Sequence, residues 1–298
     1  MNSKEERWAR EATEYLDKEY ELMYDISNLL LKQDSKVEYE MIHLYFNEWL
    51  KILDGIRILF ATRRIKISLI LIRTLFEVSL QLKYLLKDNS LIAEKVFFSK
   101  VALNYKMYLE NKELMRNKRK EKSSPEDIKK GKQKLSELKS YFNNNNERKK
   151  IYIFLENTRK ENEWIFDRLS WISLYEYYKD KGNNSEKITN ISNRKLCNRL
   201  ELRLDNGTLL YDIIYSKLSL DVHGTDVINN ENYDSIRYGM LAIDVVDEMF
   251  KKIILNCIVN NIVDFTNCLK NDTNLGERIK NTRNEYEKLR EYWNEIRI

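Results

Sequence analysis

The chain almost lacks the two residues that most often interrupt helices, with one proline, Pro125, and seven glycines in 298 residues. Folds that contain sheets need many more of both, because hairpins, tight turns and phosphate-binding loops are built from them. Hydrophobic residues make up 43% of the chain, which is enough for a sizeable core. The composition therefore predicts an all-α fold, organised as a multi-helix bundle.

The stretch Ile65–Lys87 is expected to form the central helix of this bundle. It is apolar on nearly every side, which is typical of a helix surrounded by others, because none of its faces prefers water. It also carries Arg73 and Glu77, which lie one turn apart on one face. One interpretation is a buried ion pair that fixes the register of the helix. The other is that Arg73 binds an anionic group while Glu77 orients it.

Nothing in the sequence favours a membrane or secreted location. The central stretch is about long enough to span a bilayer, but Arg73, Glu77 and Gln81 in its middle argue against a span. The first fifteen residues are charged and carry no apolar run, so we expect no signal peptide. Three widely spaced cysteines suit a reducing compartment. We therefore expect a cytoplasmic protein that makes no membrane contact.

Apolar residues recur at spacings of three and four along most of the chain, which predicts amphipathic helices within a single helical domain, residues 1–298. Besides the central helix, they are expected at 3–33, 36–61, 191–204, 209–222 and 233–269, and from residue 91 onward. The C-terminal stretch 276–298 is a further amphipathic helix. Its apolar seam could dock on the bundle or on a second subunit.

The character of the chain changes in 111–146, where apolar residues thin out and lysine and arginine dominate. Pro125 follows Ser124 there as a helix-start signal, so we expect a basic helical insertion. The net charge of +5 fits either scattered solvated lysines or contacts with the phosphates of a nucleic acid. The candidate nucleic-acid-binding residues are Arg63, Arg64, Arg116, Lys118, Arg119 and Lys120.

Several standard sites are absent from the sequence, including a phosphate-binding glycine loop, a Gly-x-Ser-x-Gly elbow and a Cys-x-x-Cys pair. Only two histidines are present, so one chain cannot form a zinc site with several histidines. Asp244, Asp247 and Glu248 share one helical face and could hold magnesium, or could form the solvated side of an amphipathic helix. We therefore expect neither a metal nor a cofactor.

His223 is the more informative histidine, because it falls at the C-terminal end of the predicted helix 209–222. That position raises the basicity of an imidazole and leaves it near solvent. Ser219, Lys217 and Tyr215 precede it by four, six and eight residues, so a histidine, a cation and hydroxyls could perform acid–base chemistry on a phosphodiester without metal. Alternatively, His223 only caps its helix. His43 lies on an apolar face and is interpreted as a core histidine whose hydrogen bonds are satisfied.

Two segments, RTLFEVSLQLKYLLKD and LLYDIIYSKLSLDVHGT, resemble a bacterial family known only as a domain of unknown function. That family combines an Arg-x-Leu-x-Glu helix with an aromatic-x-x-Leu-Ser-x-x-x-His-Gly/Pro-Ser/Thr segment. In this chain the matching residues are Arg73, Leu75, Glu77, Tyr215, Leu218, Ser219, His223, Gly224 and Thr225.

The arrangement is also similar to the HEPN superfamily of helical bundles, many of which are metal-independent RNases in bacterial defence and toxin–antitoxin systems and usually act as dimers. Their signature is an arginine four to six residues before a histidine. Here Lys217 stands six residues before His223, and Arg73 could substitute for the arginine. Lysine keeps the charge but lacks the planar fork that suits phosphate.

The resemblance implies an HEPN-like effector that cleaves RNA. In it, His223 would be the general acid and base, Arg73 and Lys217 the phosphate contacts, Glu77 the orienting group, and Tyr215 and Ser219 hydrogen-bond donors. The alternative is a non-catalytic helical sensor or adaptor, which binds a partner protein through its helical faces or a small anionic ligand between the two motif helices.

Overall fold

The computed structural model describes residues 3–32, 37–120, 124–180, 188–204, 206–217, 235–259 and 273–297. Within them the regular elements are helices, and the β-type pairing is limited to an isolated antiparallel bridge between Arg203 and Leu209. The all-α prediction is therefore confirmed. None of the described helices combines the length and apolar character that crossing a membrane requires.

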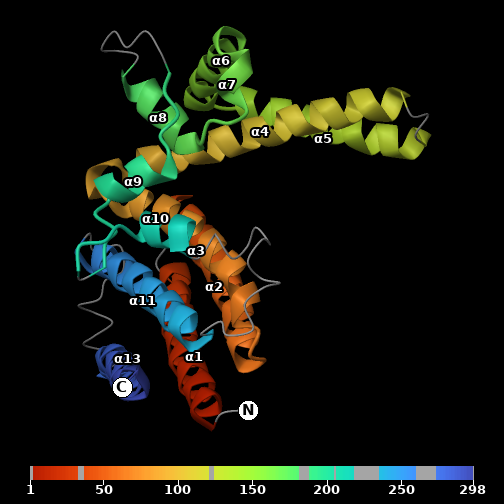
Figure 1. The fold of residues 1–298 in the computed structure, drawn as a ribbon. Coiled ribbons are helices and arrows are strands. Elements are labelled where there is room, and N and C mark those ends of the chain that lie inside the picture. The colour runs from red at the N-terminus through yellow and green to blue at the C-terminus, as the bar shows by residue number, and fades with distance from the viewer. Residues whose placement is uncertain are drawn as a thin grey trace. The chain divides into compact units, whose positions relative to one another are not determined.

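The chain divides into two compact units, one made of residues 1–92 and 192–298 and the other of residues 93–191 (Figure 1). The helices of the first unit are α1 (Ser3–Lys32), α2 (Val37–Ala61), α3 (Ile65–Leu86), η1 (Asn89–Leu91), α9 (Asn193–Arg199), α10 (Leu210–Asp212), the π-helical turn η3 (Ile213–Lys217), α11 (Ser235–Val259) and α13 (Thr273–Arg297). Those of the second are α4 (Ile92–Lys120, entered from the first unit), α5 (Pro125–Asn143), α6 (Asn146–Glu161), α7 (Glu163–Phe166) and α8 (Trp171–Asp180).

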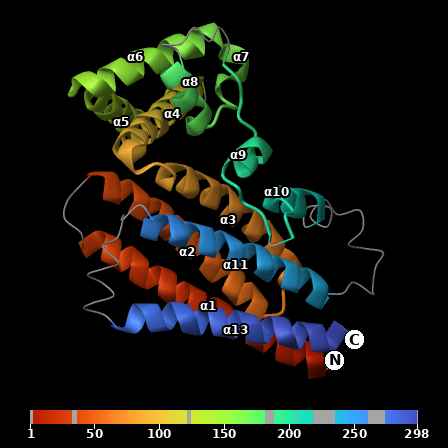
Figure 2. The ribbon, with the colours of Figure 1, turned by 90° about the vertical axis from the view of Figure 1, so that its left-hand side faces the viewer.

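The first unit is a bundle in which α1, α2, α3 and α11 pack side by side, with α13 lying along α1 (Figure 2). Large aromatic side chains fill its core, among them Trp8, Trp49 and Phe76, all fully buried. The indole nitrogen of Trp49 donates a hydrogen bond of 3.0 Å to the Ser79 hydroxyl and so ties α2 to α3. This core fixes the position of α3, which carries one predicted motif.

The central helix α3 begins and ends within one residue of the prediction, but it is not enclosed along its whole length. Its C-terminal half is buried, from Leu82 to Leu86, whereas Ile67 and Ile70 near its N-terminus are each 50% exposed. The expectation of a helix buried on every side is therefore wrong for its first turns. Apolar composition alone could not reveal which face the neighbouring helices leave open.

The start of α3 is not capped by Thr62. The Thr62 hydroxyl donates to the carbonyl of Ile58 at 2.8 Å, at the end of α2. Arg63 has a φ of 59° and forms the turn between the helices, and Arg64 is the N-cap of α3 without a side-chain cap bond.

The apolar seam of α13 packs on the bundle of its own chain. Tyr286 and Leu289 are buried, and the Tyr286 ring lies 5.6 Å from that of Tyr15 on α1. The sequence left two partners open for this seam, the bundle of its own chain and a second subunit. In the structure the seam packs on the bundle of its own chain.

The second unit contains the predicted insertion 111–146 and packs around aromatic residues. Ser124 accepts a hydrogen bond from the backbone of Asp127 as the N-cap of α5, with Pro125 in the first turn, as predicted. The Phe142 ring stacks on Tyr152 at 4.7 Å between α5 and α6. Trp164 on the short helix α7 is 79% exposed, whereas Phe166 of the same helix is buried.

The chain between the two motifs is less helical than predicted. The helix expected over 191–204 is limited to α9, and a turn with Gly207 at φ +80° follows it. The helix expected over 209–222 is described only as α10 and η3. The remaining part, including His223, lies outside the described residues.

Candidate functional site

The structure brings one residue of the second motif onto the first. The Tyr215 hydroxyl donates a hydrogen bond of 2.6 Å to Oε1 of Glu77, and the guanidinium carbon of Arg73 lies 4.4 Å from the centre of the Tyr215 ring. The Arg73 Nε is 3.5 Å from the same Glu77 oxygen. Arg73, Glu77 and Tyr215 therefore form one cluster, in which the arginine stacks on an aromatic face while the carboxylate holds both partners.

Two residues that the motifs did not include support this cluster. The Tyr211 ring stacks on Tyr215 with 4.3 Å between centroids, and the side-chain amide of Asn193 donates to the Tyr215 hydroxyl at 3.4 Å. Tyr211 precedes Tyr215 by four residues, a spacing that could have suggested the stack. Asn193 carries no such signal, because only the tertiary fold places the start of α9 beside η3.

Tyr215 lies in the π-helical turn η3, which packs against α3. Turns of this kind are rare and occur often at functional sites, because the wider backbone redirects side chains. Here the turn presents the Tyr215 ring to Arg73 and its hydroxyl to Glu77.

The Arg73–Glu77 pair is half-exposed, with 43% and 39% of the two side chains open to solvent. The interpretation of this pair as a buried structural bridge is therefore wrong. The exposed face at the start of α3 explains the difference, since the helix leaves its bundle contacts along this side. A half-exposed pair stabilises a fold little, which leaves the Arg73 cation available to an anion.

Burial raises the pKa of Tyr215, and its hydrogen bond to Glu77 raises it further, against the opposite effects of Asn193 and Arg73. Tyr215 is therefore a neutral hydrogen-bond donor at physiological pH. The cluster thus offers two groups. The arginine, Arg73, is held in place and can contact an oxyanion, and the carboxylate of Glu77 can accept a proton or a hydrogen bond. These groups suit binding and orientation of a phosphate.

The other predicted catalytic residues are only partly described. Ser219 and His223 lie outside the described residues, and Lys217 is described only as the last backbone position of η3. Their roles stay predictions. His43, interpreted as a satisfied histidine, has ring nitrogens 3.0 Å from the Ser27 hydroxyl and 2.7 Å from the Asn47 amide. Its hydrogen bonds are satisfied as expected, but the residue is only half-buried, so the expected core position is wrong.

The predicted nucleic-acid-binding residues belong to different units. Arg63 and Arg64 lie in the first, where Arg63 pairs with Glu6 at 3.2 Å. Arg116 is exposed on α4 of the second and lines a pocket of about 540 Å³ together with Lys106 and Arg159. Three further candidates, Lys118, Arg119 and Lys120, end the same helix, and their side chains lie outside the described residues.

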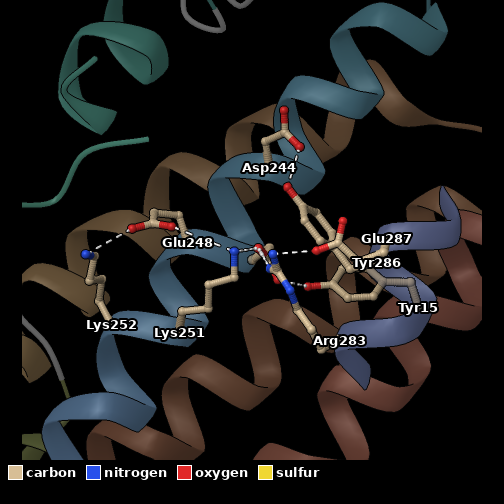
Figure 3. A network of polar contacts seen from close by, with 9 residues as sticks. Tyr15, Asp244, Glu248, Lys251, Lys252, Arg283, Tyr286 and Glu287 are labelled. Atoms are coloured by element: carbon tan, nitrogen blue, oxygen red, sulfur yellow. Dashed lines mark hydrogen bonds and ion pairs between the residues drawn. The ribbon is translucent and has the colours of Figure 1, made fainter. Parts of the chain in front are cut away.

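The acidic residues of α11, expected on a solvated face or around magnesium, are mostly buried in a network with α1 and α13 (Figure 3). Asp247 is 4% exposed, accepts a hydrogen bond of 3.0 Å from Tyr15, and forms ion pairs with Lys251 and, at 3.5 Å, with Arg283. The solvated-face interpretation is therefore wrong for this residue.

The other two carboxylates of this face are also engaged by groups of the chain. Asp244 accepts a hydrogen bond of 2.8 Å from Tyr286, and Glu248, 6% exposed, pairs with Lys252 at 3.4 Å. Lysine and arginine side chains thus occupy the surroundings that a magnesium ion on this face would take. In the part of the chain that the structure describes, no three His, Cys, Asp or Glu side chains are arranged to hold a metal.

Glu19 on α1 lies beside this network and was not singled out by the sequence. It is fully buried, and neither carboxylate oxygen has a hydrogen-bond partner among the residues that the structure describes. Burial raises its pKa well above the ordinary value, and the charge of Asp247 raises it further, whereas Tyr15 and Lys251 act in the opposite direction. Glu19 is therefore a buried acid that favours its protonated form.

Comparison with known protein families gives a match over residues 39–234, to the model of DUF5677, described as a family of unknown function. The matched stretch contains Arg73, Glu77, Tyr215 and His223. The prediction of an uncharacterised family is thereby confirmed, while the link to HEPN proteins stays a prediction. Searches of curated proteins and of solved structures gave no match.

We expect Arg73→Ala to lower the free energy of unfolding by less than about 1 kcal/mol, because half-exposed ion pairs contribute little. Leu75→Ala, which removes a fully buried side chain from the same helix, should cost about 2–5 kcal/mol. Urea unfolding of both variants measures the difference. A loss for Arg73→Ala as large as that for Leu75→Ala would mean that the pair braces the bundle.

Glu19→Gln should raise the melting temperature at pH 8 and change it less at pH 5. The unfolded chain ionises Glu19 above its ordinary pKa of 4.5, while the folded chain retains the proton, so the wild type loses stability as the pH rises toward the folded pKa. Glutamine cannot ionise and avoids this loss. Calorimetry at both pH values measures the effect, with the exposed Glu14→Gln as control. An unchanged melting temperature at pH 8 would contradict the assignment.

Proposed function

We propose that this chain, which belongs to the DUF5677 family, is an RNA-directed effector whose Arg73 cluster and His223 form one metal-independent cleavage site. The observation that carries the proposal is the half-exposed Arg73 guanidinium, held between the Glu77 carboxylate and the Tyr215 ring. Tyr215 precedes His223 by eight residues, so the segment that contacts Arg73 also leads to the histidine.

In this proposal each group has a chemical role. Arg73 and Lys217 contact oxygens of the scissile phosphate, and Glu77 and Tyr215 hold Arg73 in place. His223 takes the proton of the ribose 2′-hydroxyl as that oxygen attacks the phosphorus, and the resulting imidazolium gives that proton to the departing 5′-oxygen as its bond to phosphorus breaks. The products are a 2′,3′-cyclic phosphate and a 5′-hydroxyl. Ser219 donates a hydrogen bond to the phosphate.

The basic residues supply affinity without sequence preference, since contacts between lysine or arginine and phosphates release counterions. Arg64 and Arg116 are exposed and suit this role. Arg63, Lys118, Arg119 and Lys120 complete the proposed set. By its likeness to HEPN proteins we further propose a cytoplasmic role in bacterial defence, exercised as a homodimer.

The non-catalytic alternative uses the same cluster to bind an anionic ligand or to sense RNA without cutting it. A partner protein docked on the seam of α13 is less favoured, because Tyr286 and Leu289 of that seam are buried in the chain's own bundle. The two functions differ in one respect, namely whether a bound RNA is cleaved.

The test is incubation of the purified protein with total RNA in EDTA, followed by end-group analysis. We expect cleavage that leaves cyclic phosphates, with a loss of roughly 10²–10⁴-fold in His223→Ala because its acid–base role is removed. Arg73→Ala should also lose activity, whereas Arg10→Ala, an exposed arginine on α1, should not.

Melting temperatures of all variants show whether a loss of activity merely follows unfolding. Absence of cleavage by the wild type, or equal cleavage by His223→Ala, would contradict the catalytic proposal. If the wild type binds RNA without cleaving it, and Arg73→Ala abolishes this binding, the result would instead support the non-catalytic alternative.

A further inference from the structure

Tyr211 on α10 extends the Arg73 cluster by a second aromatic ring. The Tyr211 ring lies almost parallel to that of Tyr215, with 4.3 Å between their centroids and 17° between their planes. The guanidinium carbon of Arg73 lies 4.4 Å from the centre of the same Tyr215 ring. One arginine and two tyrosines are therefore stacked together. Aromatic rings and guanidinium groups are the side chains on which unpaired nucleic-acid bases stack.

Tyr211 is the less engaged of the two tyrosines. The Tyr215 hydroxyl is bonded to Glu77 and Asn193, and its ring also meets the edge of Phe76, with 6.4 Å between centroids. Tyr211 is half-buried, and within the described part of the chain its side chain has Tyr215 as its one aromatic contact and its hydroxyl makes no hydrogen bond. The hydroxyl is not enclosed either, so it reaches solvent. Tyr211 is thus the member of the stack that can take a further ring.

The stack is held in place from two sides. Tyr215 is bonded to α3 through Glu77 and to the start of α9 through Asn193. Asp212, next to Tyr211 in α10, pairs with Arg194 of α9 at 3.0 Å, and a second contact of 3.3 Å joins the same two groups. A rigid aromatic ring loses little conformational entropy when a ligand binds to it. The contacts with α3 and α9 therefore prepare Tyr211 for stacking.

Two guanidinium groups beside the stack can contact phosphates. Arg194 is 63% exposed, and Arg73 is half-exposed. Each is paired with a single carboxylate, Asp212 for Arg194 and Glu77 for Arg73. A guanidinium has five N–H donors, so one carboxylate leaves donors for a phosphate oxygen. The surroundings of Tyr211 thus suit both parts of a nucleotide, its base and its phosphate.

A second stack of the same composition shows why charge matters. Tyr24 stacks on Tyr20 on α1, with 6.4 Å between centroids, and Arg57 of α2 lies 5.2 Å from the centre of the Tyr20 ring. Arg57, however, is bonded to Asp17 at 2.8 Å and to Asp54 at 2.7 Å. Two carboxylates outweigh one guanidinium, so this second stack repels a phosphate. An arginine and two tyrosines are therefore not a nucleotide site by themselves, and this stack is a matched control.

We propose that Tyr211 is the base-stacking residue of the Arg73 site and that it selects an unpaired nucleotide, whose phosphates contact Arg73 and Arg194. The inference rests on the proposed function in placing RNA at the Arg73 cluster, but it does not require cleavage. A base within a duplex is stacked between its neighbours, so the Tyr211 ring receives a base only from a single-stranded segment. Every base has a π face, so this selection is tolerant of sequence.

The test is the affinity of the whole protein for a single-stranded 2′-deoxy oligonucleotide, measured by fluorescence anisotropy. This strand lacks the nucleophile and is not cleaved by the proposed mechanism. Tyr211→Ala should weaken binding roughly 5- to 150-fold, because the stacking of one base is lost. Tyr211→Phe keeps the ring and should bind as the wild type does. Tyr24→Ala, in the matched stack, should also leave the affinity unchanged.

A second strand, with abasic sugars in place of the bases, separates stacking from an effect on Arg73. Tyr211 also supports Tyr215, so its removal could weaken binding by displacing the arginine. Loss of a stacked base is felt only by the strand that carries bases, so Tyr211→Ala should not weaken binding of the abasic strand. A duplex of the same sequence should be equally insensitive. A loss of the same size on the abasic strand would overturn the proposal.

The remaining outcomes distinguish this inference from the cleavage proposal. Affinity for the single strand that is unchanged in Tyr211→Ala, or absence of binding by the wild type, would overturn the base-stacking role even if RNA is cleaved. Binding that depends on Tyr211, without cleavage of RNA, would support it and contradict the catalytic proposal instead. Melting temperatures of the Tyr211 variants confirm that the compared proteins are folded.

Discussion

The packing of α3 against α2 and α11 is the interaction on which the first unit depends. Leu75, Phe76 and Leu82 of α3 are fully buried, and burying a side chain of this size is worth about 1.5–3 kcal/mol in transfer free energy. The hydrogen bond between Trp49 and Ser79 fixes the rotation of the helix against α2. Because α3 cannot rotate or slide without exposing this core, every charged residue along it has a fixed place.

The change in burial along α3 determines what its charges can do. Arg73 stands on a partly exposed side of α3, so it keeps much of its hydration and is held by Glu77 and Tyr215 at small energetic cost. Lys83 stands where the helix is enclosed, and only 8% of it is exposed. One rigid helix thus carries a half-exposed arginine and an enclosed lysine.

Much of the fold could be predicted from the sequence, because helix periodicity and breaker residues are local signals. The bounds of α3 and the cap at Ser124 followed from such signals. The division into two units did not, since the boundary falls at the start of α4, and a helix start does not show which helices will pack together. In the site, the motifs identified Tyr215, but its contact with Glu77 and the pairing of Asp247 depend on tertiary packing, which spacing cannot encode.

The central claim is that Arg73 and His223 act on one phosphate. A crystal structure of the protein with a 2′-deoxy oligonucleotide, which lacks the nucleophile and cannot be cleaved by this mechanism, tests it most directly. The account predicts the Arg73 guanidinium and the His223 imidazole within hydrogen-bond distance of the same phosphate group, with Tyr215 still bonded to Glu77. A His223 ring more than about 10 Å from Arg73, beyond any hydrogen-bond reach, would contradict it.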